Sequence, residues 1–257
     1  MSEIYQHFRV DEKEFIDQVL DWKYQVEQMY APKLTDFLDP RQQFIIQAII
    51  GENQEVQSSF HGGFSNTERK RCLLYPDYYE PSQEDFLVGV YEIDYPKKFI
   101  TLEHRQVLGS IMSLGVVREK FGDIVVNGDR IQFSAVSEIE DYLVLELNQI
   151  GKAAVKVKKV ENDYLQSNER WAEVEKTISS LRLDVVIAGA LNMSRQKSLT
   201  LIQAGRVKVN FEQMEQNAFE CEKSDIISIR GFGRVKLMEL SGRTRKDKIR
   251  VKFGLLK

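Results

Sequence analysis

The last third of the chain is divided by glycine and asparagine into short segments with helical and then strand-like patterns. Apolar residues recur at helical spacing from residue 183 to 191, and a second such run covers residues 195–202. Ser194 directly precedes the second run as a predicted N-cap, and Gly205 follows it as the residue just past the helix end. A strand is predicted at residues 206–210, so we expect two short helices followed by strands.

Positive charge is concentrated in the same part of the chain. Residues 181–257 hold 16 Lys and Arg against 8 Asp and Glu, a net charge of +8, whereas residues 1–180 hold 20 against 31, a net charge of −11. The net charge of −3 for the whole chain therefore conceals an acidic body and a basic C-terminal part. This distribution favours a C-terminal unit that binds a polyanion, although a solvated charged surface would give the same count.

Two cations, Arg195 and Lys197, lie in the first turn of the second predicted helix. The helix dipole disfavours cations there by roughly a few tenths of a kcal/mol, so we expect a compensating anion. A phosphate group fits this role, because free N–H groups at helix N-termini bind anions and a guanidinium strengthens the site. Alternatively, Arg195 pairs with an acidic neighbour such as Asp184, and the two interpretations are compatible.

The strand-like segments after these helices carry further cations. Alternation in the first strand puts Arg206 and Lys208 on the face opposite two valines. Another strand is predicted from residue 225 to 230. A basic loop around Gly242 then leads into the strand 249–253, and such a loop can reach along a phosphate backbone. The cations of this tail are Arg243, Arg245, Lys246, Lys248, Arg250 and Lys252.

Four short motifs of this region, in this order, resemble the RNA-binding domain first described in ribosomal protein S-four, also called the alpha-L motif. They are Arg182-Leu183-Asp184, Ser194-Arg195, Gly205 to Asn210 and Asp225 to Gly231. In that family the two helices and the adjoining strand present cations to structured RNA. The resemblance places this role on Arg182, Arg195, Lys197, Arg206 and Lys208. With the cations of the later strand and tail, the candidate RNA-binding residues also include Arg230, Arg243, Arg245, Lys246 and Lys248.

One position departs from the alpha-L pattern. The family usually has glycine after the asparagine of its Val-Asn pair, and here Phe211 occupies that place. We therefore expect a remodelled turn, and Asn210 is left out of the candidate contacts.

The rest of the chain predicts further compact units. A chain of 257 residues with 42% hydrophobic composition is expected to form two or three of them. Residues 11–51 hold two apolar stripes at helical spacing, separated at Pro40, which favours packed core helices. The middle of the chain alternates strand-like segments with two predicted helices, residues 104–114 and 136–150, and closes with the strand 153–160.

We therefore predict a multidomain α+β protein. A small helical, acidic unit is expected over residues 1–70, and an alpha-L RNA-binding domain over residues 180–257. Between them, over residues 71–165, we expect an α+β sheet domain similar to the split βαβ plan of RNA-recognition modules. No run resembles the aromatic motifs of those modules, so base stacking on the middle sheet is not predicted.

Cysteine, histidine and hydropathy patterns argue against several classes of protein. Cys72 and Cys221 lie far apart in the sequence and the three histidines are scattered, so neither a disulfide framework nor a metal site of familiar spacing is predicted, and we expect no cofactor. The sequence has no long apolar run and no charged segment followed by an apolar core near residue 1. It therefore predicts neither a membrane span nor a secretory signal, and we expect a cytoplasmic location.

Several features along the whole chain together resemble the bacterial YlmH proteins. They are Gly62-Gly63-Phe64 followed by Glu68 to Arg71, the helix that begins at His104-Arg105, the turn from Arg118 to Ile124, and the basic C-terminal domain. The resemblance implies a ribosome-associated RNA-binding protein that is not an enzyme. Its implied partners are structured RNA, namely large-subunit ribosomal RNA and tRNA, and the large ribosomal subunit. Relatives are linked to quality control of obstructed large subunits that still hold peptidyl-tRNA.

The cations Arg69, Lys70 and Arg71 near the glycine pair allow two interpretations. They are expected either at a surface between domains, where they can also touch phosphate, or in a solvated linker.

Two other functional classes remain open at this point. Domains of the alpha-L type also accompany RNA-modifying enzymes such as pseudouridine synthases and methyltransferases, but neither GxGxxG nor GxxxxGK occurs, and residues 71–160 are too few for a pseudouridine synthase domain. His104 beside Arg105 has no oriented partner in the sequence that would make it an acid/base pair. The third class is a protein-binding adaptor in cell division, with a protein partner bound through residues 1–60.

Overall fold

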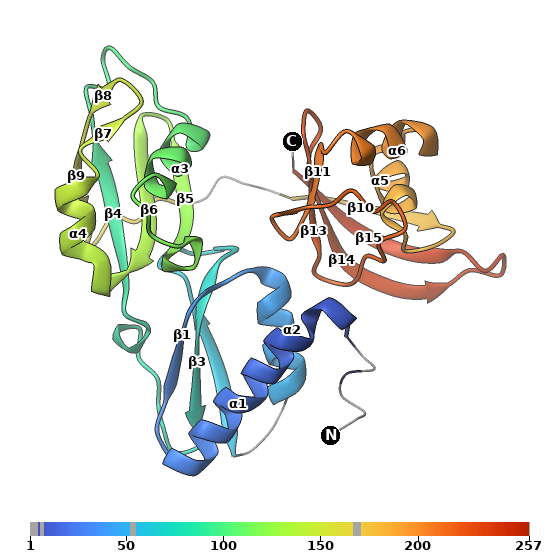
Figure 1. Cartoon of the computed structure of the whole chain (residues 1–257), viewed down its shortest axis with the longest axis horizontal. Helices are drawn as coiled ribbons and strands as arrows, with labels where there is room; N and C mark the ends of the chain where they lie inside the picture. Colours follow the sequence, from blue (N-terminus) through green and yellow to red (C-terminus); the bar gives the residue numbers. More distant parts are fainter. Residues whose placement is uncertain (1–4, 6–7, 52–54, 167–170, 257) are drawn as a thin grey trace. The chain divides into compact units, whose positions relative to one another are not determined.

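The computed structural model describes residues 5, 8–51, 55–166 and 171–256 (Figure 1). The chain forms two compact units, Met1–Asn168 and Glu169–Lys257. Both combine helices with antiparallel sheets, which confirms the predicted multidomain α+β class. Short 3-10 segments lie at Val10–Glu12, Glu84–Phe86, Arg118–Lys120 and Ser137–Ile139.

The first part of the first unit, residues 8–79, is a lobe with two helices on a small sheet, which we call the N-terminal lobe. Its elements are α1 (Lys13–Met29), β1 (Lys33–Leu38), α2 (Pro40–Ile50), β2 (Val56–His61) and β3 (Lys70–Pro76), and the antiparallel sheet has the order β1-β3-β2. Both helices contribute side chains to its core, among them Ile16 and Ile46, which are fully buried with Leu74 of β3. Pro40 stands at the start of α2, where Asp39 caps the helix by accepting N–H bonds from Arg41 and Gln42.

The N-terminal lobe corrects two predictions. The two helices are confirmed, but the lobe is not only helical, because β1 and β2 also belong to it. The strand β3 was assigned to the middle domain, and this was wrong, since β3 pairs on both sides with strands of the N-terminal lobe. β2 mixes apolar with exposed and half-buried polar residues, so it has no strong period-two pattern from which it could be predicted.

The second part of the first unit, residues 81–164, is the middle lobe. Its elements are β4 (Val88–Asp94), α3 (His104–Met112), β5 (Phe121–Asn127), β6 (Arg130–Val136), α4 (Glu140–Glu146), β7 (Gln149–Ile150), β8 (Ala153–Ala154) and β9 (Lys156–Lys159). The main sheet is antiparallel with the order β5-β6-β4-β9, so the fourth strand in sequence lies beside the first. This order confirms the split βαβ plan. Tyr91 and Phe133 pack with Val107 of α3 and Leu143 of α4 in the core.

The second helix of the middle lobe is shorter than predicted. It was expected over residues 136–150, whereas α4 covers only Glu140–Glu146. The chain then forms the small hairpin β7–β8, in which Gly151 adopts a left-handed φ of +60° at the turn. Ile150, which is fully buried, therefore belongs to this hairpin and not to a helix.

Two of the motifs singled out in the sequence meet where the N-terminal and middle lobes join. Arg69 has 6% of its surface exposed, and its guanidinium donates to the carbonyl of Phe37 (3.0 Å) in one lobe and to that of Phe121 (3.3 Å) in the other. The carboxylate of Asp123 accepts the backbone N–H groups of Glu68 (2.6 Å) and Arg69 (3.2 Å). These hydrogen bonds join the two lobes, and we call this contact the clasp.

Arg71 belongs to the same clasp. It donates to the carbonyls of Thr35 (2.7 Å) and Leu87 (3.0 Å) and pairs with Glu138 (3.3 Å), while only 3% of its surface is exposed. The interpretation as a surface between domains is therefore confirmed, and the phosphate contact is wrong for these two arginines, because their guanidinium groups are buried among protein acceptors.

The second unit is built on one six-stranded antiparallel sheet. Its elements are β10 (Ala172–Ile178), α5 (Leu183–Leu191), α6 (Arg195–Gln203), β11 (Val207–Val209), β12 (Glu212–Gln213), β13 (Ile226–Ile229), β14 (Gly233–Arg243) and β15 (Ile249–Leu256), and the order is β10-β15-β14-β13-β11-β12. Val186 and Ile187 of α5 and Ile202 of α6 form its core with Leu237 and Phe253. The strand β10 precedes the expected start of this unit at residue 180 and was not predicted.

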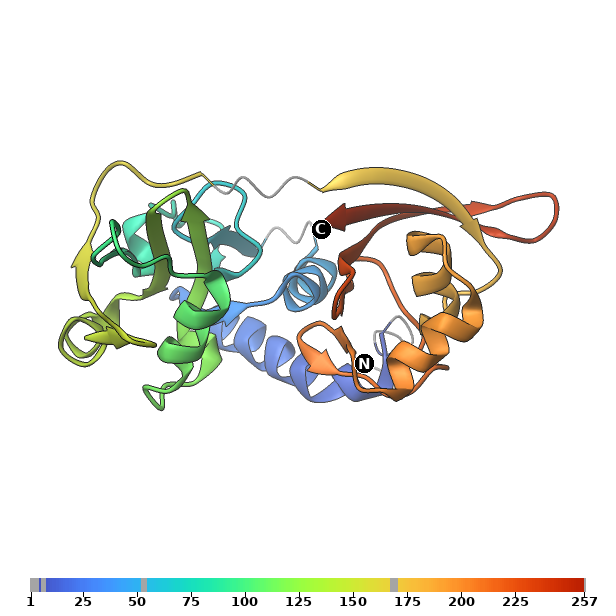
Figure 2. The same ribbon diagram turned by 90° about the horizontal axis from the view of Figure 1, so that it is seen from above.

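A long hairpin, β14–β15, extends from this sheet. β13 pairs only with residues 233–236 of β14, whereas β14 continues to Arg243 and β15 begins at Ile249. In both views the end of the hairpin projects beyond β13 and beyond the two helices (Figure 2). The predicted basic tail is therefore the tip of an arm.

Candidate RNA interface

The two helices of the second unit have the predicted start and end signals. Ser194 caps α6, since its side chain accepts the N–H of Lys197 (3.2 Å). Gly205 follows the helix end with φ +64°. Asn192 ends α5 in the left-handed conformation, with φ +51°. These signals fix a short connection between α5 and α6, which brings Asp184 of α5 close to the first turn of α6.

A buried carboxylate organises the arginines at this connection. Asp184 is fully buried and accepts a hydrogen bond from Nε of Arg195 (2.6 Å) and from Nε of Arg182 (3.2 Å). Ser198 adds a bond from its hydroxyl to the backbone carbonyl of Asp184 (2.7 Å). The ion pair between Arg195 and Asp184 is thus confirmed, and the Arg195 side chain keeps 57% of its surface exposed. Its terminal nitrogens can therefore bind a phosphate while Nε stays on Asp184.

The same arrangement sets the ionisation of Asp184. Burial raises the pKa of this carboxyl group, but hydrogen bonds from Arg195 and Arg182 and the charges of both arginines outweigh burial and lower the pKa below its ordinary value. Asp184 is therefore ionised at neutral pH and holds two guanidinium groups in place.

One further candidate cation lies beside this connection. The Lys197 ammonium group lies over the ring of Phe232, 5.1 Å from its centroid. We call Arg182, Arg195 and Lys197 the helix cluster. Arg206 and Arg230 lie at the ends of β11 and β13, where the N–H of Arg230 donates to the carbonyl of Arg206 (2.9 Å).

Lys208 does not lie on the same side of the sheet as the helices. Its neighbours Val207 and Val209 are buried in the core that α5 and α6 cover, so the alternate side chain points to the opposite face. Lys208 is exposed there, opposite Ser228 and Gln213 in the register of the sheet.

The predicted cations of the tail form a second group, the tip cluster, on the β14–β15 arm. The turn is closed by the N–H of Thr244 bonding the carbonyl of Lys248 (2.7 Å), and Arg243 pairs with Asp247 (2.8 Å). All four candidate cations of the tip are exposed, namely Arg243, Arg245, Lys246 and Lys248. The candidate residues thus lie on separate parts of one unit, with the helix cluster and the tip cluster as the two named groups, rather than in a single patch.

The turn at Asn210 keeps a tight geometry although glycine is missing. Asn210 and Phe211 both adopt positive φ, +47° and +73°, in the connection between β11 and β12. Asn210 donates to Asp225 (2.9 Å) and accepts the N–H of Ile226 (3.0 Å). Its side chain therefore fixes the start of β13.

Elsewhere the described residues hold little that suggests chemistry on a metal or thiol. They contain no group of three or more His, Cys, Asp or Glu side chains arranged for a metal ion. Cys72 and Cys221 are buried and unpaired with each other, and burial raises the pKa of the Cys72 thiol. Among the helices of residues 8–51, 55–166 and 171–256, none is long and apolar enough to cross a membrane.

Comparison with known proteins gives matches along most of the chain. Residues 11–79 match the family model "YlmH, N-terminal", and residues 81–164 match the model "Putative RNA-binding domain in YlmH". A Bacillus subtilis protein named ribosome-associated protein quality control protein P2 is 44% identical over 254 residues, which cover 98% of each chain. This chain belongs to the YlmH family. A solved structure of the family, cell division protein ylmH from Streptococcus pneumoniae, is 34% identical with a TM-score of 0.53, and the match covers 61% of this chain and 94% of that one.

The two YlmH models also sharpen the description of the first unit. They meet between residues 79 and 81, which agrees with the place of β3 in the N-terminal lobe. The RNA-binding model covers the middle lobe, for which the sequence analysis gave a fold but no RNA-binding residue. The signal that could have drawn attention to this lobe is Lys97-Lys98-Phe99, a local run of two cations and an aromatic residue in a chain segment of net negative charge.

Proposed function

We propose that this YlmH protein binds structured RNA through the helix and tip clusters of its second unit, which acts as an alpha-L domain. The observation that carries the proposal is Arg195, held by a buried carboxylate and still more than half exposed. Such a guanidinium is ordered before RNA arrives, so binding costs little side-chain entropy. The net charge of +8 in residues 181–257 favours a polyanion over a protein surface of mixed charge.

The RNA is, in this proposal, large-subunit ribosomal RNA and tRNA, and the protein acts without catalysis in quality control of obstructed large subunits in the cytoplasm. Support comes from the name of the Bacillus subtilis relative, which describes a ribosome-associated quality-control protein. The alignment covers 98% of both chains, so the similarity is not confined to one domain of that relative.

Phosphate contacts of this kind predict a steep salt dependence. If about five phosphates are neutralised, the slope of log K against log salt is about −3.5 to −4.5, from roughly −0.7 to −0.9 per contact. Bases are read little by such a surface, so affinity follows RNA shape more than sequence. A flat salt response would contradict the mechanism.

Sucrose-gradient sedimentation of the tagged full chain from lysate tests the proposal. Wild type is expected in the large-subunit fraction at low salt, and Arg195→Glu/Lys197→Glu at the top of the gradient. The control is Lys13→Glu/Lys23→Glu, which makes the same charge change on α1 and is expected to sediment like wild type. If wild type also stays at the top, ribosome association is wrong. If Arg195→Glu/Lys197→Glu stays on the large subunit as the control does, the helix cluster is not the contact.

The adaptor alternative is separated by nuclease treatment before the gradient. The protein partner proposed for residues 1–60 would stay with the tagged chain after RNA is digested, whereas an RNA-mediated association would be lost.

A further inference from the structure

The middle lobe has the strand order of RNA-recognition modules, but part of the sheet face that those modules use for bases is covered here. Val90 and Val125, which point away from the helices, are covered by Phe64 and Leu165 in a small apolar cluster. Gly63 lies so close to this face that an added Cβ would be 2.9 Å from a methyl carbon of Val90. A base therefore has no apolar surface to stack on in this part of the sheet.

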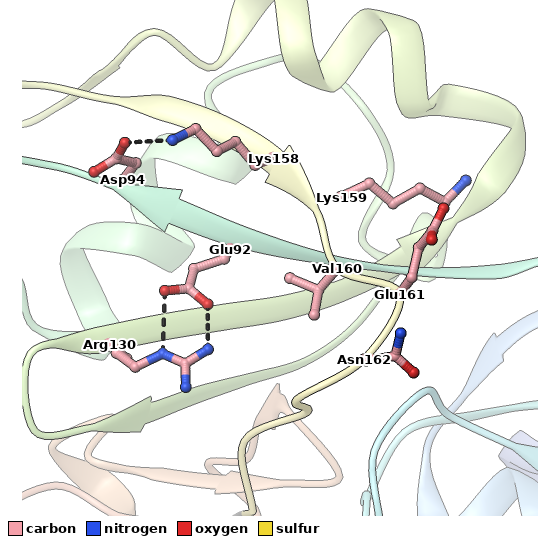
Figure 3. Close-up of a pocket in the computed structure, with 8 residues that line it drawn as sticks. All are labelled: Glu92, Asp94, Arg130, Lys158, Lys159, Val160, Glu161 and Asn162. Carbon is pink, nitrogen blue, oxygen red and sulfur yellow. Dashed lines mark hydrogen bonds and ion pairs between the residues drawn. The ribbon is translucent and has the colours of Figure 1, made fainter.

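The remainder of that face holds a pocket with a mainly polar lining, in which several side chains bind each other (Figure 3). Glu92 accepts two hydrogen bonds from Arg130, at 3.1 and 2.6 Å, and a third from Gln132 at 2.9 Å. The side-chain oxygen of Gln132 in turn accepts the N–H of Leu165 (2.9 Å). This face therefore lacks an open apolar platform, and we look for base stacking on a different surface of the lobe.

One end of the lobe presents an aromatic ring to solvent. Phe99 is 87% exposed, in the turn between β4 and α3. The turn is ordered, because the carbonyl of Pro96 accepts the N–H groups of Phe99 (3.0 Å) and Ile100 (3.2 Å). On either side of it, Tyr95 and Leu102 are buried in the core. The turn is thus anchored at both ends, and Phe99 contributes nothing to the packing that anchors it.

Exposed lysines come to this end from three segments. Lys98 precedes Phe99 in the turn. Lys156 begins β9 and lies opposite Asp94, the last residue of β4 before the turn. Lys152 is in the β7–β8 turn. Its neighbour Gly151 lies near the first turn of α3, where a Cβ added to Gly151 would be 3.8 Å from the side-chain nitrogen of Gln106.

These lysines differ from the other cations nearby. Lys97 and Lys158 have carboxylate partners at 3.9 and 2.7 Å. Within the described parts of the chain, Lys98, Lys152 and Lys156 form no such close ion pair, although the charge of Lys156 also acts on Asp94. Residues 81–164 carry 10 Lys and Arg against 14 Asp and Glu, so three exposed lysines without a close ion pair at the end that carries Phe99 stand out against a net charge of −4.

We propose that this end of the middle lobe binds an unpaired nucleotide of RNA. The base stacks on Phe99, and the flanking phosphates bind Lys98, Lys152 and Lys156. Only a single-stranded segment or loop fits, because paired bases are stacked on each other and do not offer a free face. The inference deepens the proposed function and rests on it for the partner being RNA, but it uses residues of the first unit alone.

Photocrosslinking of the full chain to a single-stranded RNA containing 4-thiouridine tests the site. Trypsin cuts after Lys98 and after Arg105, so an attached nucleotide on Phe99 is found on the peptide of residues 99–105. We expect this crosslink in wild type and its loss in Phe99→Ala. The matched control is Leu145→Ala, which removes another exposed apolar side chain, 71% exposed, from α4 of the same lobe and is expected to leave the crosslink intact.

Affinity for the same RNA gives a second readout that does not depend on photochemistry. Phe99→Ala is expected to weaken binding by about tenfold, the factor that corresponds to loss of one stacked base. The measurement is made in the Arg195→Glu/Lys197→Glu background, which suppresses binding by the second unit. An unchanged affinity, or crosslinks confined to residues 171–256, would overturn the proposal.

The same variants separate this inference from the proposed function. If Phe99→Ala changes neither the crosslink nor the RNA affinity while Arg195→Glu/Lys197→Glu is lost from the large subunit, the proposed site on the middle lobe is wrong. The proposed contact through the helix cluster is then still supported. Loss of a protein partner from Phe99→Ala after RNA has been digested would mean that the ring anchors protein rather than RNA, which also overturns the site.

Discussion

Arginine-rich segments occur in both units, and the two units use them in opposite ways. In the clasp between the lobes, Arg69 and Arg71 donate to backbone carbonyls and are almost completely buried. In the second unit the buried partner is a carboxylate, Asp184, and the arginines that bind it remain partly exposed. Arginine-rich segments therefore connect the two lobes in the first unit, whereas in the second unit they form a candidate binding surface.

The difference follows from what each guanidinium has to satisfy. An arginine has five N–H donors and no acceptor, and a guanidinium that is buried while it donates to carbonyls on two sides is not accessible to a ligand. Arg195 uses Nε on Asp184 and presents its remaining nitrogens outward. Breaking the contacts of a buried arginine costs more free energy of unfolding than breaking those of an exposed one. The comparison can therefore be tested by measuring the free energy of unfolding of arginine variants.

The largest effect is expected for Arg69→Ala. The variant leaves the carbonyls of Phe37 and Phe121 without their donor and creates a void between the lobes, so the first unit should lose about 3–5 kcal/mol of unfolding free energy. Urea unfolding followed by fluorescence of Trp22 in a Trp171→Phe background reads this unit, because the chain has two tryptophans.

A matched arginine provides the control for this experiment. The Arg105 side chain is 83% exposed and pairs with Glu103 on the surface, so Arg105→Ala should cost less than about 1 kcal/mol. Equal losses for the two variants would mean that burial of Arg69 does not stabilise the clasp.

The same positions show which features the sequence could predict and which it could not. The caps Ser194 and Gly205 and the helices between them could be predicted, because local hydrogen bonding and backbone freedom decide them. Burial of Arg69 could not, since its partners lie about 32 and 52 residues away in the chain. For the same reason β3 is predicted in the wrong lobe: a strand that is buried on both faces shows no alternation that would reveal its partner strands.

The candidate site shows the same limit. The ion pair between Arg195 and Asp184 was one of two alternatives, because eleven residues separate them and only the short turn after α5 brings them together. That Lys208 points away from the helix side follows from strand alternation. The exposure of Phe99, in contrast, depends on which neighbours cover the core, and no local pattern shows it.

The second largest effect is expected for Asp184→Ala, at about 2–3 kcal/mol in the second unit, because charged hydrogen bonds to two arginines are lost. Arg195 also loses its fixed position, so affinity for structured RNA should fall although no candidate contact is removed. The control Asp247→Ala breaks an arginine pair with an 80% exposed carboxylate and should change stability by less than about 0.5 kcal/mol. Trp171 fluorescence in a Trp22→Phe background reads both.

Acid should weaken the second unit through the same carboxylate. The folded pKa of Asp184 is lowered, so its contribution is fully present above the unfolded value of about 3.9 and is lost as pH falls through the folded pKa. The stability difference between wild type and Asp184→Ala should therefore be constant from pH 5 to 7 and shrink below about pH 4. A difference that stays constant down to pH 3 would show that charge on Asp184 is not what stabilises the connection.

The smallest effect on stability is expected where the comparison is most extreme, at the tip of the arm. Arg245 and Lys246 are exposed, and no ion pair within the described residues holds either of them, so Arg245→Ala/Lys246→Ala should change the unfolding free energy by less than about 0.5 kcal/mol. Its effect should appear only in binding. Loss of two phosphate contacts would reduce the steepness of the salt dependence by about 1.4 to 1.8, whereas an unchanged slope would limit the RNA interface to the helix cluster.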